Sequence, residues 1–133
     1  TGSIAIFLSD HAKEIIGLEL VESAVIDAEK NCINNSVSNC RFIPGDIRYS
    51  LANIKTRPDV LIIDPPRSGM HKDVVKQIMA VAPKKIVYVS CNPATMARDL
   101  AIIKDSYEIE EVQPVDMFPH TYHIESVAKI RRK

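Results

Sequence analysis

The sequence has few cysteines, no long apolar segment and no paired metal-binding motif. Its three cysteines, Cys32, Cys40 and Cys91, include no C-x-x-C spacing, which argues against a zinc site and against a disulfide framework. No apolar run approaches the roughly 20 residues of a membrane-spanning helix. Unpaired cysteines are typical of a reducing compartment. We therefore expect a cytoplasmic protein that does not enter a membrane and holds no metal ion.

An excess of either charge is also absent, because 17 basic residues balance 17 acidic ones. Free-standing nucleic-acid-binding domains usually carry a basic surplus. A chain of this composition that acts on a nucleic acid would take most of its phosphate contacts from another part of the polypeptide. The only dense basic cluster comprises Lys129, Arg131, Arg132 and Lys133, and it suits a solvated segment as well as a phosphate contact.

Apolar periodicity predicts strands that alternate with helices. Residues 59–63 and 85–89 are rich in β-branched residues, as buried parallel strands are. The predicted helices are 3–11, 22–35, 72–82 and 93–104, and the predicted strands are 14–20, 40–44, 59–63, 85–89, 107–116 and 122–130. The short connection before the last strand favours an antiparallel hairpin, because parallel neighbours need a longer crossover. The prediction is one α/β domain over residues 1–133, with a mostly parallel sheet that ends in an antiparallel hairpin.

The sequence opens with Thr1-Gly2-Ser3, immediately before the first predicted helix. A cofactor-binding α/β domain normally has a strand and a glycine turn before this helix, and its glycines let the backbone approach the ligand. We interpret Gly2 and Ser3 as the end of such a turn, with the N-terminal strand of the sheet missing. The alternative is an ordinary helix start with Ser3 as its cap. A sheet without its central strand is expected to be poorly stable alone.

Two polar segments directly follow buried predicted strands. Asp64-Pro65-Pro66-Arg67 is stiffened by two prolines, so Asp64 has a fixed place beside a ligand and Arg67 can bind a phosphate or an acid. Ser90-Cys91-Asn92-Pro93 places Cys91 just before a helix with Asn as its cap and Pro at its first position. The positive end of that helix favours a thiolate. A small buried side chain is the alternative for Cys91, and a capping turn is the alternative for Asp64.

Acidic residues follow other strands. Glu19 is placed to accept two hydroxyl donors of a ribose, and Asp46 is placed for an adenine edge. Glu125 shares a strand face with His123, and beside a pocket it can act as a general base. His123 itself is interpreted as structural. Together, Glu19 and Asp46 describe an adenosine pocket.

With these residues in place, the chain resembles the RNA uridine-5-methyltransferase family, which forms 5-methyluridine in tRNA and 23S rRNA. The resemblance covers D-P-P-R-S-G at 64–69, S-C-N-P-A-T at 90–95 and D-M-F-P-H-T-Y-H-I-E at 116–125. It implies a Rossmann-like catalytic domain that uses S-adenosyl-L-methionine. The roles it implies are Cys91 as nucleophile, Glu125 as base, Asp64 beside cofactor and uracil, and Ser3, Glu19 and Asp46 as cofactor contacts.

The resemblance also implies an upstream RNA-binding domain of the same polypeptide, and in some members an iron–sulfur domain, so we expect no such cluster in this chain. The chemistry it implies starts with addition of the Cys91 thiolate to uracil C6, which makes C5 nucleophilic enough to take a methyl group. Glu125 then removes the C5 proton, and Cys91 leaves. Two alternatives are an RNA methyltransferase that forms 5-methylcytidine and a non-catalytic α/β module that binds a nucleotide or a partner. The sequence does not identify the RNA or the uridine.

Overall fold

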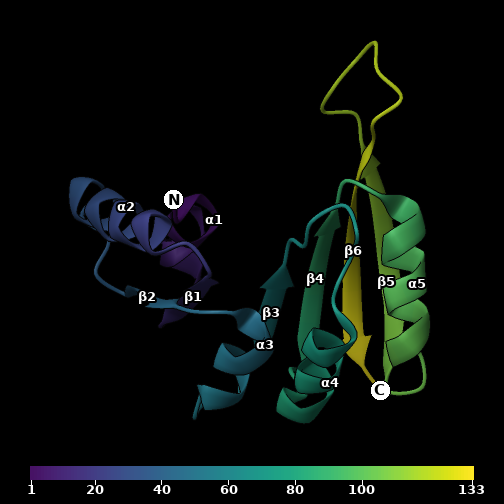
Figure 1. Ribbon diagram of the computed structural model, residues 1–133, viewed down its shortest axis with the longest axis horizontal. Coiled ribbons are helices and arrows are strands. Elements are labelled where there is room, and N and C mark those ends of the chain that lie inside the picture. The colour runs from purple at the N-terminus through teal and green to yellow at the C-terminus, as the bar shows by residue number, and fades with distance from the viewer. The chain divides into compact units, whose positions relative to one another are not determined.

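The computed structural model describes residues 1–133 and divides into two compact units. The first unit is Thr1–Asn53 and the second is Ile54–Lys133. Each unit has its own sheet, and Figure 1 shows the elements of both. The expectation of one domain over residues 1–133 stays a prediction.

The first unit packs helices on a two-stranded parallel sheet. Its elements are α1 (Ser3–Phe7), a 3-10 turn (Ser9–His11), β1 (Ile15–Glu19), α2 (Glu22–Asn34), β2 (Cys40–Pro44), α3 (Ile47–Ser50) and a second 3-10 turn (Leu51–Asn53). Helix α2 buries Val25, Ala28 and Cys32. Gly17 of β1 leaves room for the ring of Phe42, which would lie 2.4 Å from an added Cβ. The unit is thus assembled around the β1–β2 ladder.

The second unit is a four-stranded sheet in the order β3-β4-β6-β5. Its elements are β3 (Val60–Ile63), α4 (Lys72–Val81), β4 (Lys85–Ser90), α5 (Pro93–Ile103), β5 (Tyr107–Val115) and β6 (Glu125–Arg132). Strand β3 pairs parallel with β4, whereas β6 pairs antiparallel with both β4 and β5. Helices α4 and α5 lie on the same side of this sheet and contact each other (Figure 1).

The core of the second unit lies between these two helices and the sheet. Burial alternates along β4 and β6, so that one face of each strand is covered. The side chains that fill this core are Ile63, Val74, Val75, Ile78, Ile86, Tyr88, Met96, Leu100, Ile103, Ala128 and Ile130. The strands are therefore held in place by apolar packing from one side, with their carboxyl ends free to carry loops.

Most predicted elements are present, and the fold class is confirmed. The parallel β1–β2 and β3–β4 ladders and the antiparallel β5–β6 hairpin match the predicted sheet. Three predictions need correction. The helix predicted for 3–11 breaks at Leu8 into α1 and a 3-10 turn. The short helix α3 was not predicted, and it begins where Asp46 caps its first turn. Strand β6 begins at Glu125 rather than at Tyr122, because the preceding residues form a turn in which His120 has a φ of +73°.

Candidate active site

The loop after β3 is a tight turn that begins at Asp64. Asp64 follows Ile63 directly and is exposed, as the sequence predicts for a residue at the end of a buried strand. Gly69 closes the turn by donating its N–H to the carbonyl of Pro66 at 2.8 Å. Its φ of +78° is a conformation that glycine adopts without strain. The turn therefore fixes the backbone of Arg67, while the Arg67 side chain remains exposed.

The connection after β4 holds Cys91 between a strand and a helix. Asn92 caps α5, because its Oδ1 accepts the N–H of Ala94 at 3.1 Å, and Pro93 is the first helical residue. The N–H of Asn92 donates to Oγ of Ser90 at 3.0 Å. Cys91 is a half-buried free thiol on this stiff connection. The predicted local structure around Cys91 is thus present.

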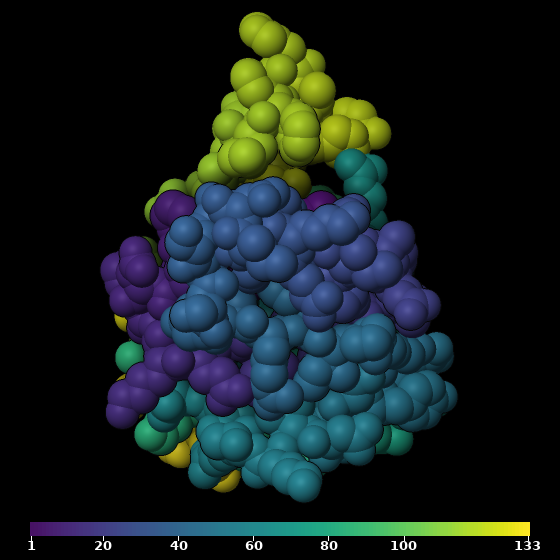
Figure 2. Space-filling model, turned by 90° about the vertical axis from the view of Figure 1, so that its left-hand side faces the viewer, coloured from purple at the N-terminus to yellow at the C-terminus, as the bar shows by residue number.

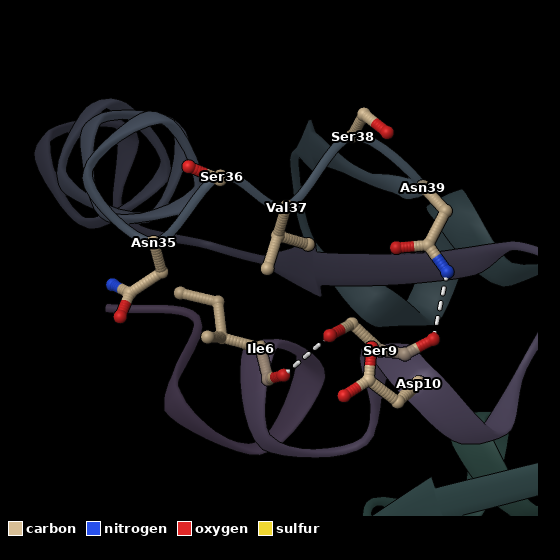
Figure 3. A pocket seen from close by; sticks show the side chains of 8 residues that line it. All are labelled: Ile6, Ser9, Asp10, Asn35, Ser36, Val37, Ser38 and Asn39. Atoms are coloured by element: carbon tan, nitrogen blue, oxygen red, sulfur yellow. Dashed lines mark hydrogen bonds between the residues drawn. The ribbon is translucent and has the colours of Figure 1, made fainter.

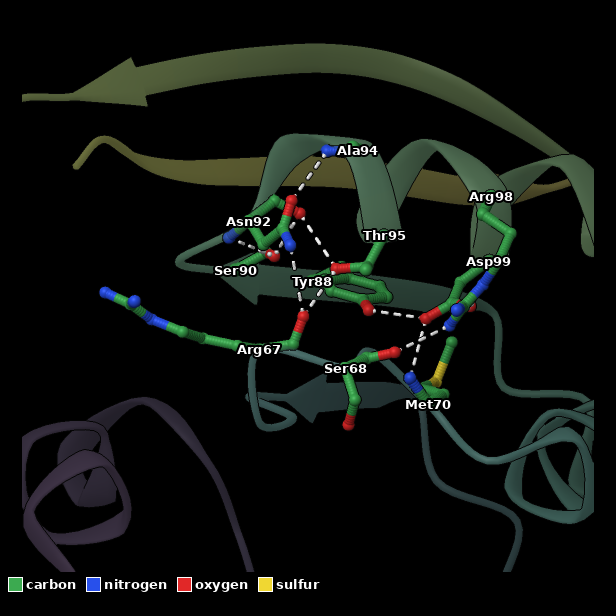
Figure 4. Close-up of polar contacts among 10 residues, drawn as sticks. All are labelled: Arg67, Ser68, Met70, Tyr88, Ser90, Asn92, Ala94, Thr95, Arg98 and Asp99. Carbon is green, nitrogen blue, oxygen red and sulfur yellow. Dashed lines mark hydrogen bonds and ion pairs between the residues drawn. The ribbon is translucent and has the colours of Figure 1, made fainter. Parts of the chain in front are cut away.

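The two loops are hydrogen-bonded to each other. Nδ2 of Asn92 and Oγ1 of Thr95 each lie 3.2 Å from the carbonyl oxygen of Arg67 (Figure 4). Both residues belong to the first turn of α5, so the same helix start that follows Cys91 also holds Arg67. The sequence motifs D-P-P-R and S-C-N-P therefore come together at one edge of the sheet.

The third motif reaches the same edge from β6. Ser90 pairs with Ser126 at the end of the β4–β6 ladder; Cys91 directly follows Ser90, and Glu125 directly precedes Ser126. Arg67 contacts the ring of His123, with its Nη2 3.1 Å from Nδ1. His123 precedes β6 and does not belong to it, so the strand-face argument that paired it with Glu125 does not apply. The structural role predicted for His123 is instead represented by its contact with Arg67.

In the first unit, Glu19 and Asp46 lie at the carboxyl ends of neighbouring strands. Glu19 ends β1 opposite Pro44, and its backbone carbonyl accepts the N–H of Gly45 at 2.9 Å. Oε1 of Glu19 accepts the N–H of Val21 at 3.0 Å, which leaves its other oxygen for a ligand. Asp46 caps α3 and binds the Arg48 guanidinium, so a ligand at Asp46 would share the Asp46 carboxylate with Arg48. Binding of an adenosine by Glu19 and Asp46 stays a prediction.

Gly2 and Ser3 begin α1. Gly2 has a φ of +75°, and an added Cβ would lie 2.9 Å from the Phe42 ring and 3.0 Å from Cβ of Ala28. Glycine is thus required here by the packing of the first unit itself. Ser3 makes no cap hydrogen bond, because the residue at the cap position is Gly2. The alternative of Ser3 as a helix cap is therefore wrong, and a role of both residues in cofactor binding stays a prediction.

Two hollows lie away from these residues. One of about 560 Å³ in the first unit lies between the Ser9–His11 turn and the segment 35–39 (Figure 3). Its walls are held by Asn39, whose Nδ2 donates to the carbonyls of Ser9 and Ala12. The other, of about 480 Å³, lies at the amino end of β4 and is lined by Lys84, Lys85, Arg131, Arg132 and Lys133. None of the predicted site residues lines either hollow.

The fold places the chain in a class of protein, the Rossmann-like methyltransferases, which recurs among solved structures. An rRNA methylase from Streptococcus thermophilus matches 96% of this chain with a TM-score of 0.75 at 8% identity, which shows the fold alone. The model of the tRNA (uracil-5-)-methyltransferase family matches residues 48–133. The chain belongs to the tRNA (uracil-5-)-methyltransferase family.

Relatives in sequence and structure agree with this assignment. An uncharacterized RNA methyltransferase of Bacteroides thetaiotaomicron is 52% identical over 131 residues, and one of Caldanaerobacter subterraneus is 44% identical over 133 residues. These matches cover 96% and 99% of this chain but only 29% and 30% of the relatives. The chain thus spans about three-tenths of the length of the curated relatives it matches.

A solved structure also matches in both sequence and fold. The Pyrococcus abyssi tRNA (uracil-54, C5)-methyltransferase, in complex with S-adenosyl-L-homocysteine, has a TM-score of 0.85 and 38% identity, over 97% of this chain and 31% of that one. S-adenosyl-L-homocysteine is what S-adenosyl-L-methionine becomes after it gives up its methyl group. The bound molecule therefore confirms the cofactor expected for the family.

Neither a membrane helix nor a metal centre is found. None of the helices is long and apolar enough to cross a bilayer. No three His, Cys, Asp or Glu side chains gather where they could hold a metal ion. Sequence reasoning missed one buried polar group that holds the turn carrying Arg67: Asp99, with its partners Tyr88 and Arg98. Its signal was helical spacing, because Asp99 lies three residues after Met96 and four before Ile103, both of which are buried.

Proposed function

We propose that the protein containing this chain methylates C5 of uridine in RNA, with Cys91 as nucleophile and Glu125 as general base. The observation that carries the proposal is the place of these two residues, one position beyond the Ser90–Ser126 pair, in a chain of this family. A tRNA or an rRNA is the substrate class. A reducing, cytoplasmic location, which three free cysteines favour, belongs to the same proposal.

The reaction needs a nucleophile because uracil C5 is a weak one. The Cys91 thiolate forms a bond from Sγ to C6, and the C5–C6 π electrons move onto C5 and the adjacent C4 carbonyl. Bound S-adenosyl-L-methionine supplies the methyl group that C5 then takes. The Glu125 carboxylate accepts the C5 proton, the electron pair of that bond restores the C5–C6 double bond, and the Sγ–C6 bond breaks to release the thiolate.

Separate roles are proposed for the other predicted site residues. Glu19 and Asp46 would hold the adenosine of the cofactor, with Gly2 and Ser3 near its other polar groups. Asp64 would lie beside cofactor and target base. Arg67 would bind the RNA, since an exposed guanidinium whose backbone is fixed suits a phosphate. These roles follow from the family and from the positions of the residues at the ends of β1, β2 and β3.

RNA is expected to contact the loop between β5 and β6. This loop projects beyond the two strands it joins (Figure 1), and it stands out in the space-filling view (Figure 2). It exposes Met117, Phe118, Tyr122 and Ile124. Tyr122 is 92% exposed. Aromatic rings stack on unpaired bases of RNA, and the loop leads directly into Glu125. A target uridine taken out of its stack would therefore meet this loop beside the proposed base.

The covalent step is tested with the full-length protein and RNA that carries 5-fluorouridine. Because fluorine cannot leave as a proton, the methylated adduct cannot eliminate Cys91, and a protein–RNA complex should survive denaturing electrophoresis. Cys91→Ala should form none. Cys40→Ala is the matched control, because burial, followed by the neighbouring Cys32, raises the pKa of the Cys40 thiol and keeps it protonated.

The outcomes separate the alternatives. An active wild-type protein that forms no adduct, or an adduct that survives Cys91→Ala, would contradict the mechanism. Methylation of cytidine instead of uridine would select the alternative of a 5-methylcytidine-forming enzyme. RNA binding without any methyl transfer by the full-length protein would select a non-catalytic binding module.

A further inference from the structure

A buried carboxylate holds the turn that carries Arg67. Asp99 of α5 is completely buried. Its Oδ2 accepts the N–H of Met70 at 2.7 Å and the hydroxyl of Tyr88 at 2.8 Å (Figure 4). Its Oδ1 accepts Nε and Nη2 of Arg98 at 3.0 and 2.7 Å. Both oxygens thus have charged or polar donors, which a carboxylate removed from water requires.

Helix α5 holds the backbone of the same turn at two further points. Nη2 of Arg98 donates to the carbonyl of Ser68 at 2.9 Å, and Oγ1 of Thr95 lies 3.2 Å from the carbonyl of Arg67. Thr95 and Asp99 are four residues apart, so they lie one above the other on one helix face. Three consecutive peptide groups around Arg67, Ser68 and Met70 are therefore fixed by a single face of α5.

The turn also packs closely against the helix. A Cβ added to Gly69 would lie 2.6 Å from Oδ2 of Asp99 and 2.5 Å from Nη2 of Arg98. Glycine thus lets the backbone approach the carboxylate closely. The Arg67 guanidinium leaves the other side of this turn and meets His123. A fixed backbone on one side and an exposed guanidinium on the other is an arrangement that positions a side chain.

We propose that Asp99 is a positioning residue, which fixes the turn that carries Arg67 so that the Arg67 side chain is placed to bind RNA. Thr95, on the same helix face, contributes to this role. The inference rests on the proposed function, in which Arg67 binds the substrate. An apolar side chain at position 99 would fill the core without the desolvation of a buried charge. What the carboxylate adds is a defined place for the 67–70 turn beside the Cys91 connection.

The experiment is a double-mutant cycle in the full-length protein, with KM for RNA measured by transfer of labelled methyl groups. Asp99→Asn keeps the shape of the side chain and removes its charge. We expect it to raise KM about three- to tenfold, the effect of losing one hydrogen bond, with a much smaller change in kcat. In an Arg67→Ala background the same change should have no further effect on KM, because Asp99 acts through Arg67. An equal increase of KM in both backgrounds would overturn the inference.

Two matched pairs keep the test valid if Asp99→Asn does not fold. Tyr88→Phe and Tyr107→Phe each remove one buried tyrosine hydroxyl, but the Tyr107 hydroxyl donates to the carbonyl of Pro83 at 2.9 Å, at the start of β4 and away from Cys91. Thr95→Val removes a hydroxyl that Thr95→Ser keeps. We expect Tyr88→Phe and Thr95→Val to raise KM, and Tyr107→Phe and Thr95→Ser to leave it unchanged. Equal KM within both pairs would overturn the inference.

The test of the Asp99 role can be distinguished from the test of the proposed function. A protein that methylates RNA without forming a 5-fluorouridine adduct would overturn the Cys91 mechanism, and the KM cycle would still decide the role of Asp99. Normal adduct formation with no coupling between Asp99 and Arg67 would overturn the role of Asp99 alone. A full-length protein that methylates no RNA would overturn both.

Discussion

Cys91 and Glu125 each lie one position beyond the Ser90–Ser126 pair, which ends the β4–β6 ladder. Directly opposed residues on antiparallel strands lie about 4.5–5.5 Å apart at their Cα atoms. Two groups that act on C6 and C5 of one small ring need to be that close. The antiparallel pairing of β6, and not the parallel part of the sheet, therefore places the proposed nucleophile and the proposed base at the same end of the β4–β6 ladder.

The first prediction concerns the base. Glu125→Gln should still form the Cys91 adduct with ordinary RNA but should release it slowly, because an amide does not accept the C5 proton. We expect kcat to fall about 10²- to 10⁴-fold while the covalent complex accumulates on a denaturing gel. Glu111→Gln, an exposed change on β5, is the control. Full activity of Glu125→Gln would reject the assignment of the base.

The second prediction concerns the cofactor. Glu19→Gln should weaken binding of S-adenosyl-L-methionine by the full-length protein about ten- to a hundredfold, since a charged acceptor for ribose hydroxyls is lost. Isothermal calorimetry gives the affinity. Glu14→Gln is the control, because Glu14 lies before the other end of β1 and pairs with Arg41. Equal affinities of the two variants would exclude Glu19 from the cofactor site.

The third prediction concerns RNA contact. Tyr122→Ala should weaken binding of substrate RNA about 5- to 100-fold, the effect of losing one stacked base, whereas Tyr122→Phe keeps the ring and the affinity. Fluorescence anisotropy with a labelled RNA measures both. Tyr49→Ala removes another exposed tyrosine, 69% exposed, and should change little. A loss of affinity in Tyr122→Phe as large as in Tyr122→Ala would argue against stacking.

The fourth prediction concerns alkaline pH. Burial, followed by the hydrogen bond to Asp99, raises the pKa of Tyr88 above its ordinary value near 10. The folded chain therefore keeps a proton that the unfolded chain loses, and the resulting stability is complete below about pH 10 and declines as pH rises further. Tyr88→Phe should flatten the decline of the urea midpoint between about pH 9 and 11. If the urea midpoint of Tyr88→Phe declined as steeply as that of the unaltered chain, Tyr88 would ionise without unfolding the protein.

The strands and helices could be predicted because local pattern decides them. The runs at 60–63 and 85–90 are apolar and β-branched, and Asn92-Pro93 marks a helix start by its chemistry. The start of β6 could not be predicted from the local sequence pattern. Tyr122 and Ile124 look like strand residues, but the turn before Glu125 decides where the pairing with β4 and β5 begins.

The residues at strand ends could be predicted from their order, whereas the groups that hold them could not. Asp64, Cys91 and Glu125 stand beside recognisable motifs. The partners of Asp99 come from positions 29 residues and 11 residues away, and only the folded chain brings Met70 and Tyr88 to its carboxylate. Sequence spacing can place Asp99 on the buried face of α5, but not the donors that make its burial possible.

Strands β1 and β3 each pair on one side only, β1 with β2 and β3 with β4. Each thus presents a row of peptide N–H and C=O groups that no other strand of this chain satisfies. Such rows are templates for β-augmentation, and a concentrated solution of the 133-residue polypeptide should self-associate through them. Charged or proline substitutions on these edges, for example Ile62→Lys, are the natural way to obtain a monodisperse sample for spectroscopy.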